Sequence, residues 1–308
     1  MILCLGTTPV YQRSMTFAKV VTNGVNRATE VSDYASGKSI NAARVIHTLG
    51  RDVILTGFVG GSRGRMLCGD LDATGIRHDF VMVPAETRQC ITVIDSSTSA
   101  ATELVEESSP VDETCWKSLD LRLRVLLPNA RAWIFSGTLP HGAPQDFYAR
   151  WLPLAAQLGT LAVIDARGEP LRLAMKHSKA VFKLNREEFA ETLNADLSRD
   201  DHLIEAICQH APLGGKLIVT LGASGAIGSD GRSAWRVKSP QVKAISAVGS
   251  GDAFAAGLAM ALSEDKALDD ALRLAAACGA ANAMTSLAGH LDPAEVERLL
   301  PDVEIDSL

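Results

Sequence analysis

The sequence lacks the signals of several protein classes. No stretch reaches the ~18 consecutive apolar residues that span a bilayer, and no cationic signal segment opens the chain. The six cysteines include no Cys-x-x-Cys pair and have no histidine at metal-ligand spacing. The 30 basic residues are scattered and the net charge is −6, which disfavours nucleic acid or an anionic membrane as a partner. These absences predict a cytoplasmic protein with reduced thiols that acts on small molecules.

Apolar segments that alternate with helical patterns indicate a parallel sheet. With 308 residues, 47% of them hydrophobic, the chain can bury a large α/β core. Strands are expected at 1–6, 53–59, 132–135, 160–165, 180–183 and 216–220. Helices are expected at 41–49, 65–73, 145–158, 201–210, 253–262, 267–285 and 293–300. Strands separated by helices predict a parallel sheet that is covered on both faces.

Two segments of the first half instead show the pattern of half-exposed antiparallel strands. Residues 17–32 and 88–105 alternate apolar and polar side chains with turn residues between them. Because the elements around them fit the main sheet, they predict a small sheet inserted in a single domain of residues 1–308. We expect this insertion to come from about 10–35 and 86–106 and to form a lid.

The run Gly249-Ser250-Gly251-Asp252 joins a glycine-rich turn to a helix start. Flexible glycines let backbone N–H groups converge, and the first turn of a helix adds partial positive charge. This arrangement predicts an anion site, with Asp252 placed to accept a proton from a hydroxyl that attacks the anion. The alternative is that Gly251 and Asp252 only cap the helix, since Asp is a favoured N-cap residue.

Three further segments carry polar or glycine residues at strand or helix ends. A Ser-Gly-Lys-Ser turn lacks the first glycine of a P-loop. Lys38 and Asn41 are therefore expected to project toward a ligand from a helix start, unless Lys38 is a solvated loop residue. Asn185 and Glu188 can hold the water shell of Mg²⁺ beside phosphates, and they also fit a capping box. The glycine-spaced turn at 220–225 suits a flat ligand such as a nucleotide base or ribose.

In this order the segments resemble the PfkB (ribokinase-like) carbohydrate kinases over essentially the whole chain, and look most like the 1-phosphofructokinase and tagatose-6-phosphate kinase branch. The resemblance is carried by Gly37-Lys38-x-x-Asn41-x-Ala43-Arg44, Thr87-Arg88, Ser136-Gly137-Thr138-Leu139-Pro140, Asp165-x-x-Gly168-Glu169, Lys183-x-Asn185-x-x-Glu188, Thr220-Leu221-Gly222-x-x-Gly225 and Gly249-Ser250-Gly251-Asp252. It implies an α/β ribokinase-like three-layer sandwich with a mostly parallel central sheet and a small antiparallel β-lid. It also implies ATP, Mg²⁺ and phosphorylation of a hydroxymethyl group on a sugar phosphate of the fructose 1-phosphate or tagatose 6-phosphate class.

The resemblance also assigns roles to residues. Asp252 would be the base, while the backbone of Gly249, Ser250 and Gly251 would neutralise charge on the transferred phosphoryl group. The nucleotide and Mg²⁺ would be held by Lys183, Asn185, Glu188, Thr220, Gly222, Gly225, Gly249, Ser250 and Asn282, with Asn185 and Glu188 serving the metal. The phosphorylated sugar would be held by Gln12, Arg27, Gly37, Lys38, Asn41, Arg88, Ser136 and Gly137.

Four residues depart from this branch: Thr8 and Gln12 replace Asn and Asp, and Ser36 and Ser39 replace glycines. Gln12 puts a neutral amide where a carboxylate would accept hydrogen bonds from two sugar hydroxyls, so we expect poor use of fructose 1-phosphate and tagatose 6-phosphate. The alternative functions are a kinase of an unphosphorylated sugar or nucleoside, and a non-catalytic sugar-phosphate or nucleotide-binding protein. The expected partners are a small-molecule sugar phosphate and a second copy bound through the lid, with no nucleic acid and no membrane.

Overall fold

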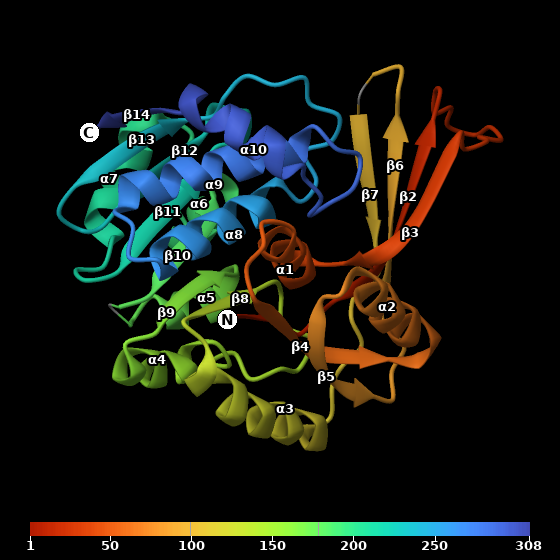
Figure 1. Cartoon of the computed structure of the whole chain (residues 1–308), viewed down its shortest axis with the longest axis horizontal. Coiled ribbons are helices and arrows are strands. Elements are labelled where there is room, and N and C mark those ends of the chain that lie inside the picture. The colour runs from red at the N-terminus through yellow and green to blue at the C-terminus, as the bar shows by residue number, and fades with distance from the viewer. Residues whose placement is uncertain (99, 178) are drawn as a thin grey trace.

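The computed structural model describes residues 1–98, 100–177 and 179–308 (Figure 1). The strands of its large sheet are β1 (Ile2–Gly6), β4 (Val53–Gly60), β5 (Arg77–Val83), β8 (Ala132–Ser136), β9 (Leu161–Asp165), β10 (Val181–Asn185), β11 (Lys216–Thr220), β12 (Ala226–Ser229), β13 (Ala234–Lys238) and β14 (Glu304–Ser307). Their order is β14-β13-β12-β11-β10-β9-β8-β1-β4-β5.

The large sheet is mostly parallel, as the alternation of strands and helices predicts. The strands from β11 to β5 pair in parallel, whereas β12, β13 and β14 add an antiparallel edge that the sequence analysis did not identify. From β1 the chain builds outward through β4 and β5, and later returns to place β8 on the other side of β1. Ligand sites in open parallel sheets form at the carboxyl ends of the strands beside such a reversal.

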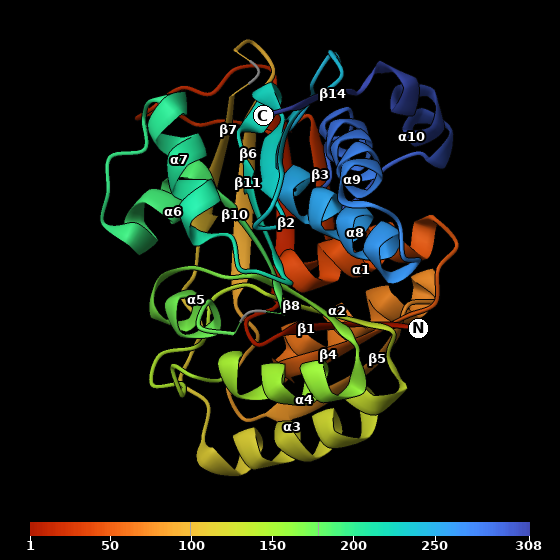
Figure 2. The ribbon, with the colours of Figure 1, turned by 90° about the vertical axis from the view of Figure 1, so that its left-hand side faces the viewer.

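Helices cover both faces of the large sheet and give two separate cores (Figure 2). One face carries α1 (Lys38–Thr48), α2 (Gly61–Thr74), α8 (Ser250–Ser263), α9 (Leu268–Ala283) and α10 (Pro293–Leu299). The other carries α3 (Glu113–Leu126), α4 (Leu152–Leu158), α5 (Gly168–Ala174), α6 (Arg186–Leu193) and α7 (Asp200–His210). Along β8, Ile134 packs in the first core, while Trp133 and Phe135 pack in the second. The three-layer α/β sandwich is therefore confirmed.

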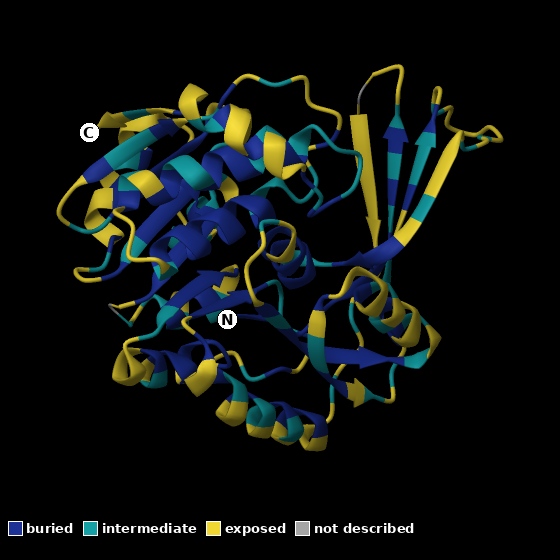
Figure 3. Cartoon of the chain, in the orientation of Figure 1, coloured by how far each residue is buried: buried dark blue, intermediate teal, exposed yellow. Residues whose placement is uncertain are grey.

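The small sheet joins two hairpins that lie far apart in the sequence. Its strands are β2 (Val10–Phe17), β3 (Glu30–Ser36), β6 (Gln89–Asp95) and β7 (Ala100–Val105), in the order β3-β2-β6-β7. Each hairpin is antiparallel as expected, and a parallel pair of β2 and β6 joins the two hairpins. The sheet stands beside the main sheet, and β7 is exposed along its length (Figure 3).

The segment 17–32, expected to carry half-exposed strands with turn residues between them, is mostly a loop. β2 ends at Phe17, and residues 18–29 form the loop to β3. In this loop the Asn26 side chain accepts a hydrogen bond from Val21 N and donates one to Val21 O, both at 2.8 Å. Such local bonds from an asparagine to the backbone favour a turn over a strand.

The helix predicted from residue 145 starts later. Residues 141–148 form turns, a short 3₁₀ turn follows at Ala149–Trp151, and α4 begins at Leu152. Pro153 occupies the first turn of α4, where a missing N–H costs no intrahelical hydrogen bond. The apolar pattern before Leu152 comes from side chains that pack in the core without forming a helix, such as Phe147 and Tyr148.

The remaining expectations about the chain as a whole concern thiols and membranes. All six cysteines are unpaired, as expected, and Cys208 is exposed. Within the described ranges, no helix has the length and apolar character needed to cross a bilayer.

Candidate active site

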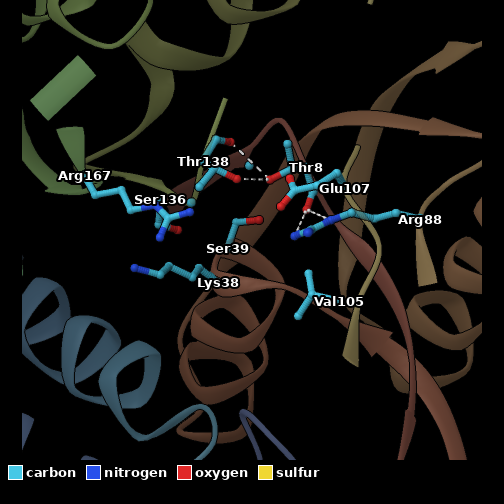
Figure 4. Close-up of a pocket in the computed structure, with 11 residues that line it drawn as sticks. Thr8, Lys38, Ser39, Arg88, Val105, Glu107, Ser136, Thr138 and Arg167 are labelled. Carbon is cyan, nitrogen blue, oxygen red and sulfur yellow. Dashed lines mark hydrogen bonds between the residues drawn. The ribbon is translucent and has the colours of Figure 1, made fainter. Parts of the chain in front are cut away.

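Two cavities open at the carboxyl ends of the parallel strands and meet at Lys38. The small cavity, about 150 Å³, is lined by Gly6, Thr8, Lys38, Ser39, Arg88, Val105, Glu107, Ser136, Gly137, Thr138 and Arg167 (Figure 4). The large cavity, about 950 Å³, is lined by residues that include Lys38, Lys183, Asn185, Glu188, Thr220, Gly222, Gly225, Ser250, Gly251 and Asp252. Because Lys38 lines both, a ligand in one cavity can approach a ligand in the other.

Asp252 lies in the first turn of α8, on the wall of the large cavity. The N-cap of α8 is Gly249, whose φ of 84° is a conformation that favours glycine. A Cβ added at Gly249 would lie 2.7 Å from the backbone N of Gly289, so no larger residue fits this turn. The Asp252 carboxylate accepts a hydrogen bond from Asn41 Nδ2 at 2.7 Å. Its geometry is therefore not that of a simple helix cap.

The first turn of α1 presents two predicted site residues. Gly37 is the N-cap, with a φ of 108°, and Lys38 is the first residue of the helix. Asn41, one turn later, accepts a hydrogen bond from Ser36 Oγ at 2.9 Å while its amide donates to Asp252. Ser36 thus orients the amide that contacts the candidate base.

A buried carboxylate at the end of β9 organises the lysines. Asp165 is fully buried and accepts hydrogen bonds from Lys38 Nζ at 2.6 Å and from Lys183 Nζ at 2.8 Å. Lys38 Nζ also donates to Glu188 Oε1 at 3.3 Å. Asp165 was not predicted as a site residue. A signal was available, because Asp165 ends a strand in register with Ser136, which ends the neighbouring strand.

This cluster adjusts the acidity of its two aspartates in opposite directions. Burial opposes ionisation of Asp165, but Lys183 and Lys38 outweigh it and lower the pKa of Asp165 to about 2. Burial and the Asp165 carboxylate raise the pKa of Asp252 to about 6, against the opposing effect of the two lysines and Asn41. A carboxylate with this pKa is ionised at neutral pH and is more basic than an ordinary aspartate.

Asn185 and Glu188 form the capping box of α6. Asn185 Oδ1 accepts from Glu188 N at 2.8 Å, and Glu188 Oε2 accepts from Asn185 N at 3.0 Å. Both residues also line the large cavity. Carboxylate and amide oxygens keep further lone pairs, and Mg²⁺ retains several waters in sites with one or two carboxylates. The residues present therefore fit a hydrated Mg²⁺ while serving as a cap.

The large cavity also contains an unpaired hydroxyl. Ser250 Oγ is buried and has no hydrogen-bond partner among the residues that the structure describes. It belongs to the first turn of α8, where the helix carries partial positive charge. The Gly222 and Gly225 backbone lines the same cavity, beside Thr220. These features fit a ligand with phosphate groups.

The small cavity holds Arg88, Ser136 and Gly137, all predicted to bind the sugar. Arg88 donates from Nε and Nη2 to Thr8 O at 3.2 and 3.0 Å, and from Nη1 to Glu106 O at 3.2 Å. Since these acceptors are neutral carbonyls, the charge of Arg88 remains available to an anion. The sequence analysis did not identify Arg167 or Glu107 as site residues, although Arg167 lies within the Asp165-x-x-Gly168-Glu169 motif.

Two of the four residues that differ from the 1-phosphofructokinase and tagatose-6-phosphate kinase pattern line this cavity. Ser39 packs against Gly6, where an added Cβ would come within 2.0 Å of Ser39 Oγ. Thr8 Oγ1 donates to Thr138 O at 3.1 Å and ties the ends of β1 and β8 together.

Six predicted site residues do not line either cavity: Gly37, Asn41 and Gly249, which belong to the starts of α1 and α8 described above, and Gln12, Arg27 and Asn282. Gln12 is buried in the small sheet, where Nε2 donates to Thr92 Oγ1 at 2.8 Å. Asn282 is buried and braces the backbone, donating to Val248 O at 3.0 Å and accepting from Gly289 N at 2.8 Å. Arg27 is exposed in the loop between β2 and β3.

Comparison with known proteins agrees with this geometry. A tagatose-6-phosphate kinase from Staphylococcus epidermidis is 29% identical over 310 residues, which cover 99% of each chain. Phosphofructokinase-2 from Escherichia coli, solved with substrates and products, has the same fold, with a TM-score of 0.90 at 24% identity over 97% of this chain and 98% of that one. A tetrameric inhibited form of the same enzyme gives a TM-score of 0.87 at 23% identity and the same coverage. The pfkB family carbohydrate kinase model matches residues 1–294, and the chain therefore belongs to this family.

Proposed function

We propose that the protein transfers the γ-phosphoryl group of ATP to a hydroxymethyl group of a phosphorylated ketohexose, of the fructose 1-phosphate or tagatose 6-phosphate class. The position of Asp252 carries this proposal: a buried carboxylate with a raised pKa lines a nucleotide-sized cavity, which meets a smaller cationic cavity at Lys38. The tagatose-6-phosphate kinase relative supports a sugar phosphate as the acceptor. A non-catalytic binding protein is not favoured, because the base and its charged neighbours are all in place. A kinase of an unphosphorylated sugar is not favoured, because the relative is a sugar-phosphate kinase.

In the proposed reaction Asp252 accepts the proton of the acceptor hydroxyl. The oxygen then bonds to the γ-phosphorus as the bond to the bridging oxygen breaks, and ADP leaves with that electron pair. Backbone N–H groups at the start of α8 stabilise negative charge on the transferred group. Such catalysis depends on positioning and charge, without a covalent enzyme intermediate.

The other charged residues prepare the site. Lys183 Nζ lies 3.1 Å from the Cβ position of Gly251, so its ammonium adjoins the turn where phosphates would sit. Asp165 holds Lys38 and Lys183 together through ion pairs with both ammonium groups. Asn185 and Glu188 would hold the hydrated Mg²⁺, which when bound supplies neutralisation of the phosphate charge.

We further propose that the small sheet acts as a lid and that two copies pair through its outer face. Met15, Ile91 and Val93 lie on that face, together with Val31 and Leu104, which are 51% and 55% exposed. Isolated proteins seldom leave such apolar groups uncovered on a sheet. Since ATP is the proposed donor, we expect the protein to work in the cytoplasm.

The test is a panel of acceptors. ADP release is measured with MgATP and fructose 1-phosphate, tagatose 6-phosphate, other ketohexose phosphates, and the unphosphorylated ketoses. We expect turnover of phosphorylated ketoses alone. Higher kcat/KM for an unphosphorylated ketose would contradict the proposal.

A further inference from the structure

Two of the three basic residues predicted to bind the phosphate of the acceptor sugar are not free to do so in the structure. Lys38 was expected to bind it, but the Lys38 ammonium donates to Asp165 at 2.6 Å and to Glu188 at 3.3 Å. These carboxylates offset its charge. Arg27, the other expected cation, lies outside the small cavity. A phosphate dianion bound beside Arg88 therefore requires a second cation within reach.

The small cavity contains such a cation in Arg167. Arg167 follows β9 by two residues, and its side chain enters the cavity from the side opposite Arg88 (Figure 4). Across the described residues, the ion pairs that arginines form include neither Arg88 nor Arg167. Glu107 also lines the cavity, but one carboxylate offsets only one of two guanidinium charges. The cavity therefore retains positive charge for an anionic ligand.

Ser136 gives independent evidence for a ligand at this place. Ser136 lines the cavity and is 3% exposed, and its buried Oγ has no hydrogen-bond partner among the described residues. Ser136 is in register with Asp165, so the Arg167 loop leaves the neighbouring strand at the same edge of the sheet. A buried hydroxyl without a partner is uncommon and indicates that a bound group completes it.

We propose that Arg167 and Arg88 clamp the phosphate of the acceptor between them, with the Ser136 hydroxyl as a third donor. This inference rests on the proposed function and names Arg167 as the residue that selects phosphorylated over unphosphorylated sugars. Each guanidinium offers paired N–H donors that match phosphate oxygens.

The test compares Arg167→Ala, Arg167→Lys and Arg131→Ala with the wild-type enzyme on the preferred ketohexose phosphate. Arg131 is an exposed arginine that precedes β8 at its other end and is the matched control. We expect Arg167→Ala to raise the KM for the sugar phosphate about 10- to 100-fold, with kcat and the KM for ATP within about twofold. Arg167→Lys should recover only part of this loss, because an ammonium lacks the planar fork. Inhibition by inorganic phosphate, competitive with the sugar phosphate, should weaken in parallel.

Three results would overturn the clamp. If Arg167→Ala behaves like Arg131→Ala, the cavity does not use this guanidinium. A lower kcat with an unchanged KM for the sugar would place Arg167 at the transferred phosphoryl group instead. A wild-type enzyme that phosphorylates only unphosphorylated ketoses would refute the proposed function together with the clamp, whereas the first two results would leave the proposed function standing.

Discussion

Asp252 owes its basicity to groups on other elements of the fold. Burial and the Asp165 carboxylate disfavour its ionisation, while Lys38, Lys183 and Asn41 limit the effect, and the pKa of Asp252 comes to about 6. The base is therefore ionised at neutral pH and still binds a proton more tightly than an exposed aspartate does. Its contribution to catalysis can be separated from its contribution to binding.

The substitution Asp252→Asn should separate chemistry from binding. We expect kcat to fall by roughly 10²–10⁴, the usual effect of losing a general base, while the Kd for ATP changes little. Steady-state kinetics and calorimetric titration with ATP measure the two quantities. Asp270→Asn, at an exposed carboxylate in the first turn of α9, is the control. Wild-type turnover by the Asp252 variant would reduce this residue to a structural one.

The rate should also depend on pH through Asp252. Because the raised pKa keeps the carboxyl protonated below about 6, we expect kcat/KM to fall as the pH drops through that value. Asp165→Asn removes a neighbouring negative charge, so the pKa of Asp252 should decrease and the acidic limb should move to lower pH. The measurement is kcat/KM of the wild type and of Asp165→Asn at pH values from about 4.5 to 8, spaced closely enough to resolve a shift of about one pKa unit. A limb that stays in place in the variant would show that Asp165 does not act on the base.

At the scale of elements, a structural role and a functional role often fall on the same residues. The capping box of Asn185 and Glu188 orders the start of α6 at the end of β10, which also places both side chains in the large cavity. The turn before α8 also has both roles, since the conformation of Gly249 starts the helix and directs its first turn toward the cavity.

Gly249→Ala should damage both the turn and turnover. The left-handed conformation costs an alanine ~1–2 kcal/mol, and its Cβ would lie 2.7 to 2.8 Å from Gly289 and Ala288. Gly142→Ala is a matched control, because Gly142 has a φ of 78° with nothing within 4 Å of the Cβ position. Thermal unfolding and kcat should both decrease more at Gly249. Equal effects at the two sites would mean that the close approach to Gly289 is unimportant.

At the scale of the whole molecule, the strand order decides where the site lies. The reversal between β1 and β8 opens the sheet edge at Thr8 and Ser136, and the small sheet stands beside that opening. Arg88, which directly precedes β6, and Val105 of β7 complete the wall of the small cavity. Movement of this sheet would therefore change access to the acceptor subsite and exclude water during transfer.

If two copies pair through the outer face of the small sheet, a charge placed on that face should lower the molecular mass measured in solution. Leu104→Glu puts a charge in the proposed interface and should convert a dimer to a monomer, because an unpaired buried carboxylate is strongly disfavoured. Light scattering coupled to gel filtration measures the mass. Leu121→Glu, at an exposed leucine on α3, should leave it unchanged. If the wild type is monomeric, or if Leu104→Glu keeps the dimeric mass, the interface lies elsewhere or is absent.

Local patterns were enough for β1, β4, β8, β9, β10 and β11, for most of the helices and for the Gly-Ser-Gly-Asp turn, but they missed β5, the antiparallel edge of the large sheet, α3 and α5. Hydrophobic periodicity and glycine-rich turns depend on residues close together in the chain, which a sequence displays directly. Only the tertiary structure decided which charges meet: Lys38 pairs with Asp165 across 127 positions, and Asn41 contacts Asp252 across 211. It likewise turned Gln12 toward Thr92 and brought Arg167 opposite Arg88. Hydrogen bonds and charge interactions act over a few ångströms, and those separations are set by how distant elements pack.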